Sequence, residues 1–192
     1  MARIPAVPDA EAGVIGRLAY RLMRRRFGAV PEPFAVARHH PRLFWASLVA
    51  AFAHQWAPTT LPTRVRELAV YRVATQVGCS WCVDFGTMLQ RLEGLDVERL
   101  QHIDEYATSP LYEPVERLAI GYADAVTAQP PTVTDAQVAE LEAVLGRAGL
   151  VELTHEIALE NMRARNYHAL GIVDQGFDEA CRVRLNPAAS RG

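Results

Sequence analysis

The chain has 192 residues, of which 50% are hydrophobic and 22% are charged, and its formal net charge is −2. This composition is typical of one globular domain with a sizeable core, and near-neutral charge gives no electrostatic reason to expect nucleic acid as a partner. No segment approaches the run of about 18 apolar residues that a membrane span needs. The first residues lack the order of a secretory signal, and three cysteines do not make a disulfide scaffold, so we expect a reducing cytoplasm.

Proline, glycine and capping residues divide the chain into helices, with almost no alternating strand pattern. The predicted helices, in chain order, cover Glu11–Phe27, a short stretch ending at His39, Pro41–Trp56, Thr63–Val77, Cys79–Leu92, a segment from Asp96 to Tyr106, Pro114–Ala128, a segment from Thr134 to Leu145, and Leu150–Leu170. We therefore predict an all-α fold. We expect a helical extension over residues 1–30, one domain over 31–175 and a tail over 176–192.

Two of these helices differ in character. Apolar residues cover most of the circumference of Thr63–Val77, which predicts a buried helix. The helix over Glu11–Phe27 is basic and amphipathic, and it carries the apolar residues Val14, Leu18, Leu22 and Met23. Three placements are open for it: against the domain, over a neighbouring subunit, or solvated at the surface.

A CxxC motif, Cys79-Ser80-Trp81-Cys82, stands at the start of a predicted helix, directly after Gly78. Residues three apart share a helical face, so the two sulfur atoms can approach closely. The unpaired N–H groups and the dipole of a helix N-terminus favour a thiolate and lower a cysteine pKa. The pattern favours a redox pair, in which one cysteine reacts and the other resolves the adduct as a disulfide. Zinc binding and plain packing are the alternatives.

The zinc interpretation needs two more ligands at a suitable spacing. The six histidines are scattered, no second CxxC motif exists, and Cys181 stands alone near the C-terminus. We therefore expect no metal, and a packed or surface thiol at Cys181. A thioredoxin-type site is also disfavoured, because a helix rather than a strand precedes the motif.

Glu67 is the second unusual residue, because it shares a helical stripe with Tyr71 and Ala74. Burial there would raise its pKa and make it a proton acceptor near neutral pH. The alternative is a structural salt bridge with Arg64 or Arg66.

Glu67, eleven intervening residues and then Cys79-x-x-Cys82 resemble the alkylhydroperoxidase D and carboxymuconolactone decarboxylase family. The run Pro62-x-x-Val65-Arg66-Glu67-Leu68 is similar to the entry into that family's central helix, and residues 115–119 and 151–166 resemble its later helices. The resemblance covers most of the chain, roughly residues 31–173. It implies an all-helical homo-oligomer (dimer, trimer or hexamer) that reduces peroxides or disulfides. It also implies a protein thiol as electron donor and no cofactor, neither metal nor flavin.

The same resemblance implies the roles of individual residues. Cys82 would attack the peroxide, Cys79 would resolve the adduct and meet the electron donor, and Glu67 would be the base. The family motif has the form CxHCxxxH, whereas Trp81 and Gly86 stand at the two histidine positions here. The proton relay is therefore incomplete as written.

Geometry shows why the missing histidines matter. If the two helices run antiparallel from a turn at Gly78, Glu67 lies about 12 Å along its helix from the level of Cys82. Tyr71 lies one turn nearer, and its phenol can both donate and accept a hydrogen bond. We expect Tyr71 with water to bridge the gap, the alternative being an ordinary packed aromatic. The spacing of Asp84 directs it to a different face.

Three functions remain in competition. The leading hypothesis is a thiol-based oxidoreductase, peroxidase-like or disulfide-reducing. The second is a non-catalytic scaffold or redox sensor, which the missing histidines favour. The third is a carboxymuconolactone decarboxylase-like enzyme, which would not need the two cysteines. Apolar residues on more than one helix face, Trp45 and Phe52 among them, also favour a homo-oligomer, with neither nucleic acid nor membrane as a partner.

Overall fold

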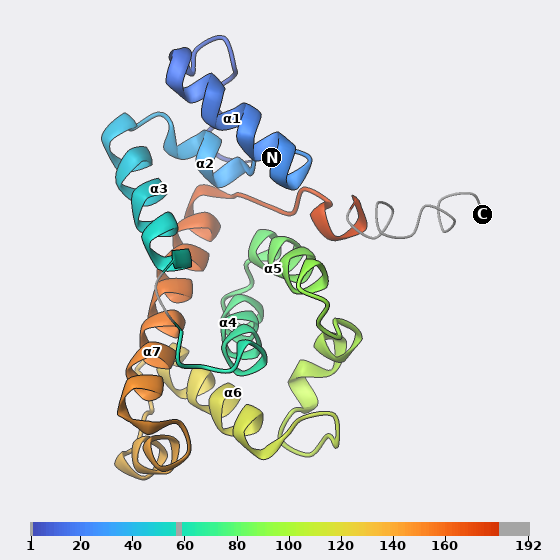
Figure 1. Ribbon diagram of the computed structural model, residues 1–192, viewed down its shortest axis with the longest axis vertical. Coiled ribbons are helices and arrows are strands. Elements are labelled where there is room, and N and C mark those ends of the chain that lie inside the picture. Colours follow the sequence, from blue (N-terminus) through green and yellow to red (C-terminus); the bar gives the residue numbers. More distant parts are fainter. Residues whose placement is uncertain (1, 57–58, 181–192) are drawn as a thin grey trace, which may run out of the picture.

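The computed structural model describes residues 2–56 and 59–180, apart from the side chains of residues 52 and 54–56, so the expectations for Phe52 and Cys181 lie outside it. The described residues form helices joined by short connections, with no strand among them, which confirms the predicted all-α fold (Figure 1). The elements are α1 (Gly13–Phe27), α2 (Glu32–Ala37), α3 (Pro41–Trp56), α4 (Thr63–Val77), α5 (Ser80–Leu92), the 3-10 helix η1 (Glu98–Glu105), α6 (Pro114–Thr127) and α7 (Asp135–Leu170).

Helix α4 lies at the centre, where α5, α6 and α7 pack around it (Figure 1). One of its faces, with Val65, Ala69 and Val73, joins α6 and α7 in a shared apolar core. Another face, with Leu68 and Tyr71, packs against η1 and α6. Each fully buried Val or Leu side chain stabilises the fold by about 1.5–3 kcal/mol. The prediction that this helix is apolar all round because it is buried is confirmed.

Three predicted helices differ in detail from those observed. The segment after Asp96 forms a 3-10 helix rather than an α-helix, and the Asp96 carboxylate accepts the Glu98 N–H at 3.1 Å. The helices predicted before and after Leu145 join into α7, which is interrupted only at Gly146, where φ is +69°. Glycine adopts this left-handed conformation without the strain that a Cβ would bring.

The N-terminal segment contacts the rest of the chain through α2 and the end of α7. The backbone N–H of Arg3 donates to the Leu170 carbonyl at 2.7 Å, and the backbone N–H of Val7 donates to the carbonyl of Ala35 on α2 at 3.1 Å. The Phe27 ring meets the edge of Phe85 on α5, with 5.1 Å between centroids. Of the three placements considered, contact with the domain is therefore observed.

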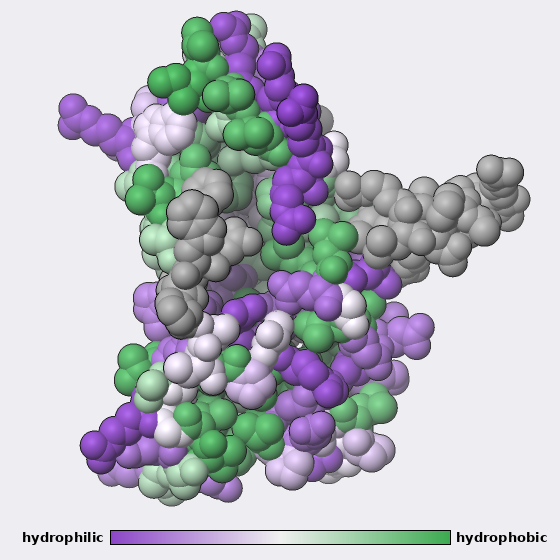
Figure 2. Space-filling view, in the orientation of Figure 1, coloured by the Kyte–Doolittle hydropathy of each residue, from purple (hydrophilic) through white to green (hydrophobic). Residues whose placement is uncertain are grey.

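Met23 of α1 is buried, but an apolar stripe of the same helix, formed by Val14, Leu18 and Leu22, does not take part in this packing. The exposed fractions of Val14, Leu18 and Leu22 are 75%, 54% and 55%. Helix α3 likewise exposes Leu43 and Val49, at 54% and 65%. Figure 2 shows apolar residues at the surface beside strongly polar ones in the upper part of the molecule, where Figure 1 places α1 and α3. Within the part of the chain described, no helix combines the length and apolarity needed to cross a membrane.

Candidate active site

A tight glycine turn brings the cysteine pair against the end of α4. Gly78 ends α4 in the left-handed conformation, with φ of +74°, and its N–H donates to the Thr75 carbonyl at 3.2 Å. The next N–H, that of Cys79, donates to the Ala74 carbonyl at 3.0 Å. Cys79 then serves as the N-cap of α5. The chain thus reverses within two residues, and the start of α5 lies beside the end of α4.

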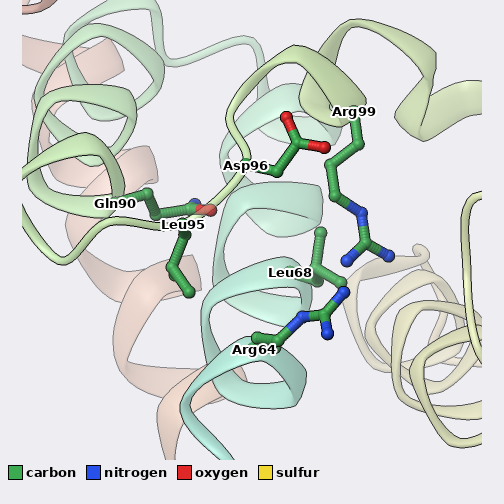
Figure 3. Close-up of a pocket in the computed structure, with 6 residues that line it drawn as sticks. All are labelled: Arg64, Leu68, Gln90, Leu95, Asp96 and Arg99. Carbon is green, nitrogen blue, oxygen red and sulfur yellow. The ribbon is translucent and has the colours of Figure 1, made fainter.

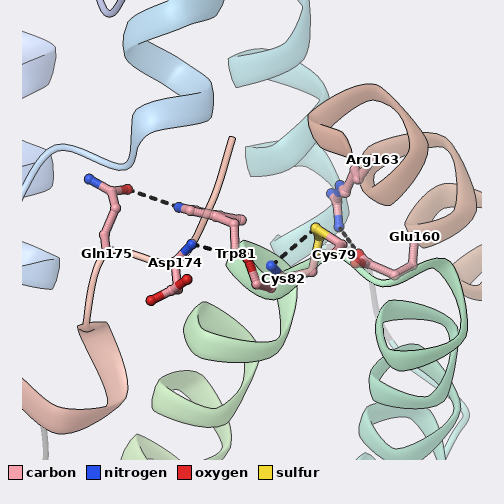
Figure 4. Close-up of a disulfide and its surroundings, with 8 residues drawn as sticks. Cys79, Trp81, Cys82, Glu160, Arg163, Asp174 and Gln175 are labelled. Carbon is pink, nitrogen blue, oxygen red and sulfur yellow. Dashed lines mark hydrogen bonds and ion pairs between the residues drawn. A yellow bond between two sulfur atoms is a disulfide. The ribbon is translucent and has the colours of Figure 1, made fainter. Parts of the chain in front are cut away.

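A disulfide joins Cys79 and Cys82, whose Cα atoms are 5.3 Å apart. The backbone N–H of Cys82 donates to the Cys79 sulfur at 3.2 Å, so the N-terminus of α5 is directed at that atom (Figure 4). The exposed fractions of the two residues are only 2% and 7%. The structure therefore brings together the two cysteines that the sequence analysis paired, in a largely buried setting.

An aromatic cluster occupies the first of the two missing histidine positions. The Trp81 ring stacks on Phe85 with 4.6 Å between centroids and meets the edge of Tyr167 at 5.2 Å. Its indole N–H donates to the Gln175 side-chain oxygen at 2.8 Å (Figure 4). Trp81 is thus a packing residue in the same buried cluster as the two cysteines.

Asp84 holds a strap formed by residues 174–178 against the start of α5. Its carboxylate accepts the backbone N–H groups of Gln175, Phe177 and Asp178, at 3.0, 3.0 and 2.9 Å. The Ser80 hydroxyl accepts the backbone N–H that precedes them at 3.2 Å. Asp84 thus holds the backbone of the strap, and its side chain lies on a different face of α5 from the cysteines.

The second missing histidine position is open. Gly86 lies one helical turn after Cys82, and apart from its neighbours in the chain and the backbone of its own helix, no atom lies within 4 Å of the place where its Cβ would be. A small molecule that approaches α5 at Gly86 therefore reaches the helix face that carries Cys82.

Glu67 is partly buried and paired with its neighbour in sequence. Its carboxylate accepts two hydrogen bonds from the Arg66 guanidinium, at 3.0 and 2.8 Å, so the predicted salt bridge is present. Burial nevertheless raises the pKa of Glu67, with Arg66 opposing and Glu93 and Glu156 reinforcing the rise. The salt bridge and the raised pKa therefore coexist.

Tyr71 lies in a different cluster from Glu67, among buried apolar residues of α4, η1 and α6. Burial raises its pKa, while a hydrogen bond with Thr87 of α5 opposes the rise. Glu67 is not among the groups that shift the pKa of Tyr71. The structure thus places Tyr71 beside α5, about one turn beyond the cysteines.

Glu160 on α7 is a buried carboxylate that the sequence analysis missed. Its exposed fraction is 6%, and Figure 4 shows its side chain directed toward the disulfide beside that of Arg163. A signal for it is present in the sequence, because Leu153, Ile157 and Ala164 repeat at spacings of three and four with Glu160 in the same stripe. A glutamate inside an apolar helical stripe indicates a buried carboxylate.

Two depressions lie near α4. A hollow of about 710 Å³ adjoins Val77, whose side chain packs on the cluster that contains the cysteines, and its wall includes Arg165 and His168. A second depression, of about 10 Å³, is large enough for little more than one water molecule (Figure 3). It is lined by Arg64, Leu68, Gln90, Leu95, Asp96 and Arg99. Only the first is large enough for a substrate.

The guanidinium of Arg99, which lines the smaller depression, makes structural hydrogen bonds. It donates to the Glu116 carboxylate at 3.2 and 2.5 Å and to the Leu111 carbonyl at 2.7 Å. Among the described residues, no group of three histidine, cysteine or acidic side chains is arranged to hold a metal ion. The cysteine pair with its neighbours is therefore the candidate active site.

A helical domain whose central helix turns through glycine into a capped CxxC motif defines a class of all-α proteins with a cysteine pair at a helix start. The chain belongs to the carboxymuconolactone decarboxylase family. The sequence model of that family matches residues 41–125. The uncharacterized protein YnjA of Escherichia coli (strain K12) is 34% identical over 165 residues, which cover 84% of this chain and 87% of YnjA.

Solved structures share the fold at lower sequence identity. An alkylhydroperoxidase AhpD core, an uncharacterized peroxidase-related protein from Ralstonia eutropha JMP134, superposes with a TM-score of 0.77 at 19% identity, covering 92% of this chain and 94% of that one. A variant of the debrominase Bmp8 in complex with 2,3,4-tribromopyrrole gives a TM-score of 0.75 at 17% identity, covering 95% and 97%. These likenesses establish the fold.

Proposed function

We propose that this chain is a thiol-based oxidoreductase that reduces a small peroxide or disulfide through reversible formation of the Cys79–Cys82 disulfide. The observation that carries the proposal is the disulfide itself, at the N-terminus of α5 and beside the open position at Gly86. A helix N-terminus stabilises the thiolate that such chemistry needs. Family membership and the shared fold of a peroxidase-related protein support the same reaction class.

The peroxidase reaction assigns a separate step to each cysteine. The Cys82 thiolate attacks the peroxide, the O–O bond breaks, an alcohol leaves after taking a proton, and Cys82 becomes a sulfenic acid. Cys79 then attacks that sulfur, the S–O bond breaks, water leaves and the disulfide forms. A protein dithiol returns two electrons by thiol–disulfide exchange and is itself oxidised. No cofactor takes part.

Glu67 is the proposed base for Cys82, as the family position implies. Its raised pKa suits a proton acceptor near neutral pH, and its pairing with Arg66 fixes the carboxylate. Tyr71 with water is the proposed link between them, and its phenol is held beside α5 near Thr87.

Reductive debromination is a second candidate, favoured by the fold shared with Bmp8 and by the aromatic wall around Trp81. Here a cysteine thiolate would take the bromine from an aromatic carbon, which then takes a proton. The second cysteine would displace bromide and form the disulfide. Release of bromide from 2,3,4-tribromopyrrole by the reduced protein separates this reaction from the first.

Turnover of an organic hydroperoxide tests the leading proposal. We expect the purified chain to consume tert-butyl hydroperoxide with dithiothreitol as donor, at a rate that saturates with peroxide. Peptide mapping of samples withdrawn during turnover should find Cys79 linked to Cys82. A rate no greater than that of dithiothreitol alone would contradict peroxidase activity. Tightly bound zinc, released only on oxidation, would contradict the redox role of the pair.

A further inference from the structure

One buried carboxylate beside the disulfide has no part in the chemistry described so far. Glu160 lies on the inward stripe of α7, between Ile157 and Ala164, both of which have no exposed surface. Ala164 belongs to the same buried cluster as Cys79 and Cys82. This contact fixes α7 beside the cysteine pair, with Glu160 one turn before the point of contact.

The side chain of Glu160 is directed toward the disulfide (Figure 4). Figure 4 shows its carboxylate and the Arg163 guanidinium on the α7 side of the disulfide, next to Cys79. Tyr167, two turns after Glu160, meets the edge of the Trp81 ring. The same face of α7 therefore covers both the disulfide and the aromatic residue between the two cysteines.

Glu160 is poorly satisfied for a buried carboxylate. Among the described residues, the charged partner of the Glu160 carboxylate is Arg163, with 4.0 Å between nitrogen and oxygen, which is too long for a hydrogen bond. Burial raises the pKa of Glu160 to about 7, which Arg163 opposes and which Glu67 on α4 and Glu156 on α7 reinforce. Buried acidic groups without hydrogen bonds destabilise a fold, so one retained beside a reactive pair indicates a chemical role.

We propose that Glu160 accepts the proton of the Cys79 thiol when Cys79 attacks the sulfenic acid on Cys82, and returns a proton to Cys79 when the disulfide is reduced. The S–S bond forms as the S–O bond breaks, water leaves, and Glu160 holds the thiol proton. In the reductive half, the first donor thiol attacks Cys79 and releases Cys82 as a thiolate. The second donor thiol then displaces Cys79 as a thiolate, which takes the proton back from Glu160. This step rests on the proposed function.

The proposal divides the proton transfers between two carboxylates. Glu67 on α4 serves the attack of Cys82 on the substrate, and Glu160 on α7 serves closure of the disulfide by Cys79. The motif on α5 lacks its two histidines, so a carboxylate from another helix supplies the acceptor for the second step.

Closure of the disulfide after one equivalent of peroxide tests this assignment. The reduced protein is mixed with hydrogen peroxide between pH 5 and pH 9, and samples are quenched for mass mapping of sulfenic acid and disulfide. In the wild type, closure should accelerate through an apparent pKa near 7. In Glu160→Gln, closure at pH 7 should slow by about 10²-fold, the acceleration near pH 7 should vanish, and sulfenic acid should accumulate on Cys82.

The sign of the change separates proton transfer from a charge effect. Removal of a negative charge alone favours the Cys79 thiolate and would speed closure, so unchanged or faster closure in Glu160→Gln overturns the proposal. The matched control Glu140→Gln changes an exposed glutamate of the same helix and should leave closure unchanged.

A second variant keeps the test decisive if Glu160→Gln does not fold. Arg163 opposes the rise in the pKa of Glu160, so Arg163→Gln should move the acceleration of disulfide closure to higher pH. Acceleration at an unchanged pH overturns the proposal. A wild type that forms neither sulfenic acid nor disulfide would overturn the proposed function, and this step with it. A reactive wild type matched by Glu160→Gln overturns this step alone.

Discussion

At the scale of single residues, two positions on α5 distinguish this site from the family motif. Trp81 stands at the first histidine position, where its indole stacks on Phe85 and donates a hydrogen bond to Gln175. A packed aromatic residue therefore replaces the histidine. Gly86 leaves its position empty. The Trp81 cluster therefore packs beside the buried cysteine pair, whereas open space lies one helical turn along α5, which favours approach of the substrate along the Gly86 side of the helix.

The ionisation of Glu160 should be visible in the stability of the protein. Its folded-state pKa of about 7 lies above the ordinary value of 4.5, so the folded state binds the proton more tightly. The stability that this proton contributes is fully present below pH 4.5 and is lost as the pH rises through 7. The loss is of the order of 3 kcal/mol.

Glu160→Gln removes this dependence. The difference in unfolding free energy, variant minus wild type, should therefore rise by about 2–3 kcal/mol between pH 5 and pH 8. Urea unfolding of both oxidised proteins at the two pH values measures it. A difference that stays constant between the two pH values would show that Glu160 keeps an ordinary pKa.

At the scale of elements, helical periodicity was sufficient to predict most of the architecture. The bounds of α3 and α4 agree with those predicted, because Pro41, Pro62 and Gly78 stop and start helices through local backbone geometry. The segment after Asp96 follows the same apolar spacing but forms a 3-10 helix. Spacing alone cannot separate these two forms over a short segment.

The candidate site was predictable only where its parts are adjacent in sequence. The CxxC pair and the salt bridge of Glu67 with Arg66 are local, and the sequence analysis named both. Glu160 lies 78 residues after Cys82, so its approach depends on how α7 packs against α5. Which helix supplies a buried carboxylate is a tertiary fact that no local spacing encodes.

The strap over residues 174–178 should depend on Asp84. Asp84→Ala removes an acceptor of three backbone hydrogen bonds, and the free energy of unfolding should fall by about 2 kcal/mol. Urea unfolding of the oxidised protein measures this. Asp135→Ala, which removes an exposed acid from the first turn of α7, should cost about 0.5 kcal/mol or less. Equal effects from both substitutions would show that the strap does not depend on Asp84.

Charge and exposed apolar surface are unevenly distributed over the whole molecule. Residues 1–56 contain eight arginines and three acidic residues, whereas the remainder contains 12 arginines and 19 acidic residues. The basic N-terminal part also exposes the apolar stripes of α1 and α3. Residues 1–56 of one copy, which are basic and expose apolar stripes, complement the acidic remainder of another copy. This complementarity supports the expected homo-oligomer.

Sedimentation should find an assembly larger than the 21.2 kDa chain at micromolar concentration. The double substitution Leu18→Glu and Val49→Glu, on the exposed stripes of α1 and α3, should dissociate it to monomers. Leu111→Glu alters another exposed leucine, outside these helices, and should leave the assembly intact. A wild type that sediments as a stable monomer would contradict the expected homo-oligomer.

The most direct test of the redox account compares Cys79→Ser, Cys82→Ser and Cys181→Ser with the wild type in peroxide turnover. We expect Cys82→Ser to lose activity to the level of the donor alone. Cys79→Ser should still react once and stop as a sulfenic acid on Cys82, which dimedone traps. Cys181→Ser should retain full activity, since that thiol has no part in the pair. Wild-type turnover that survives in Cys82→Ser would contradict the account.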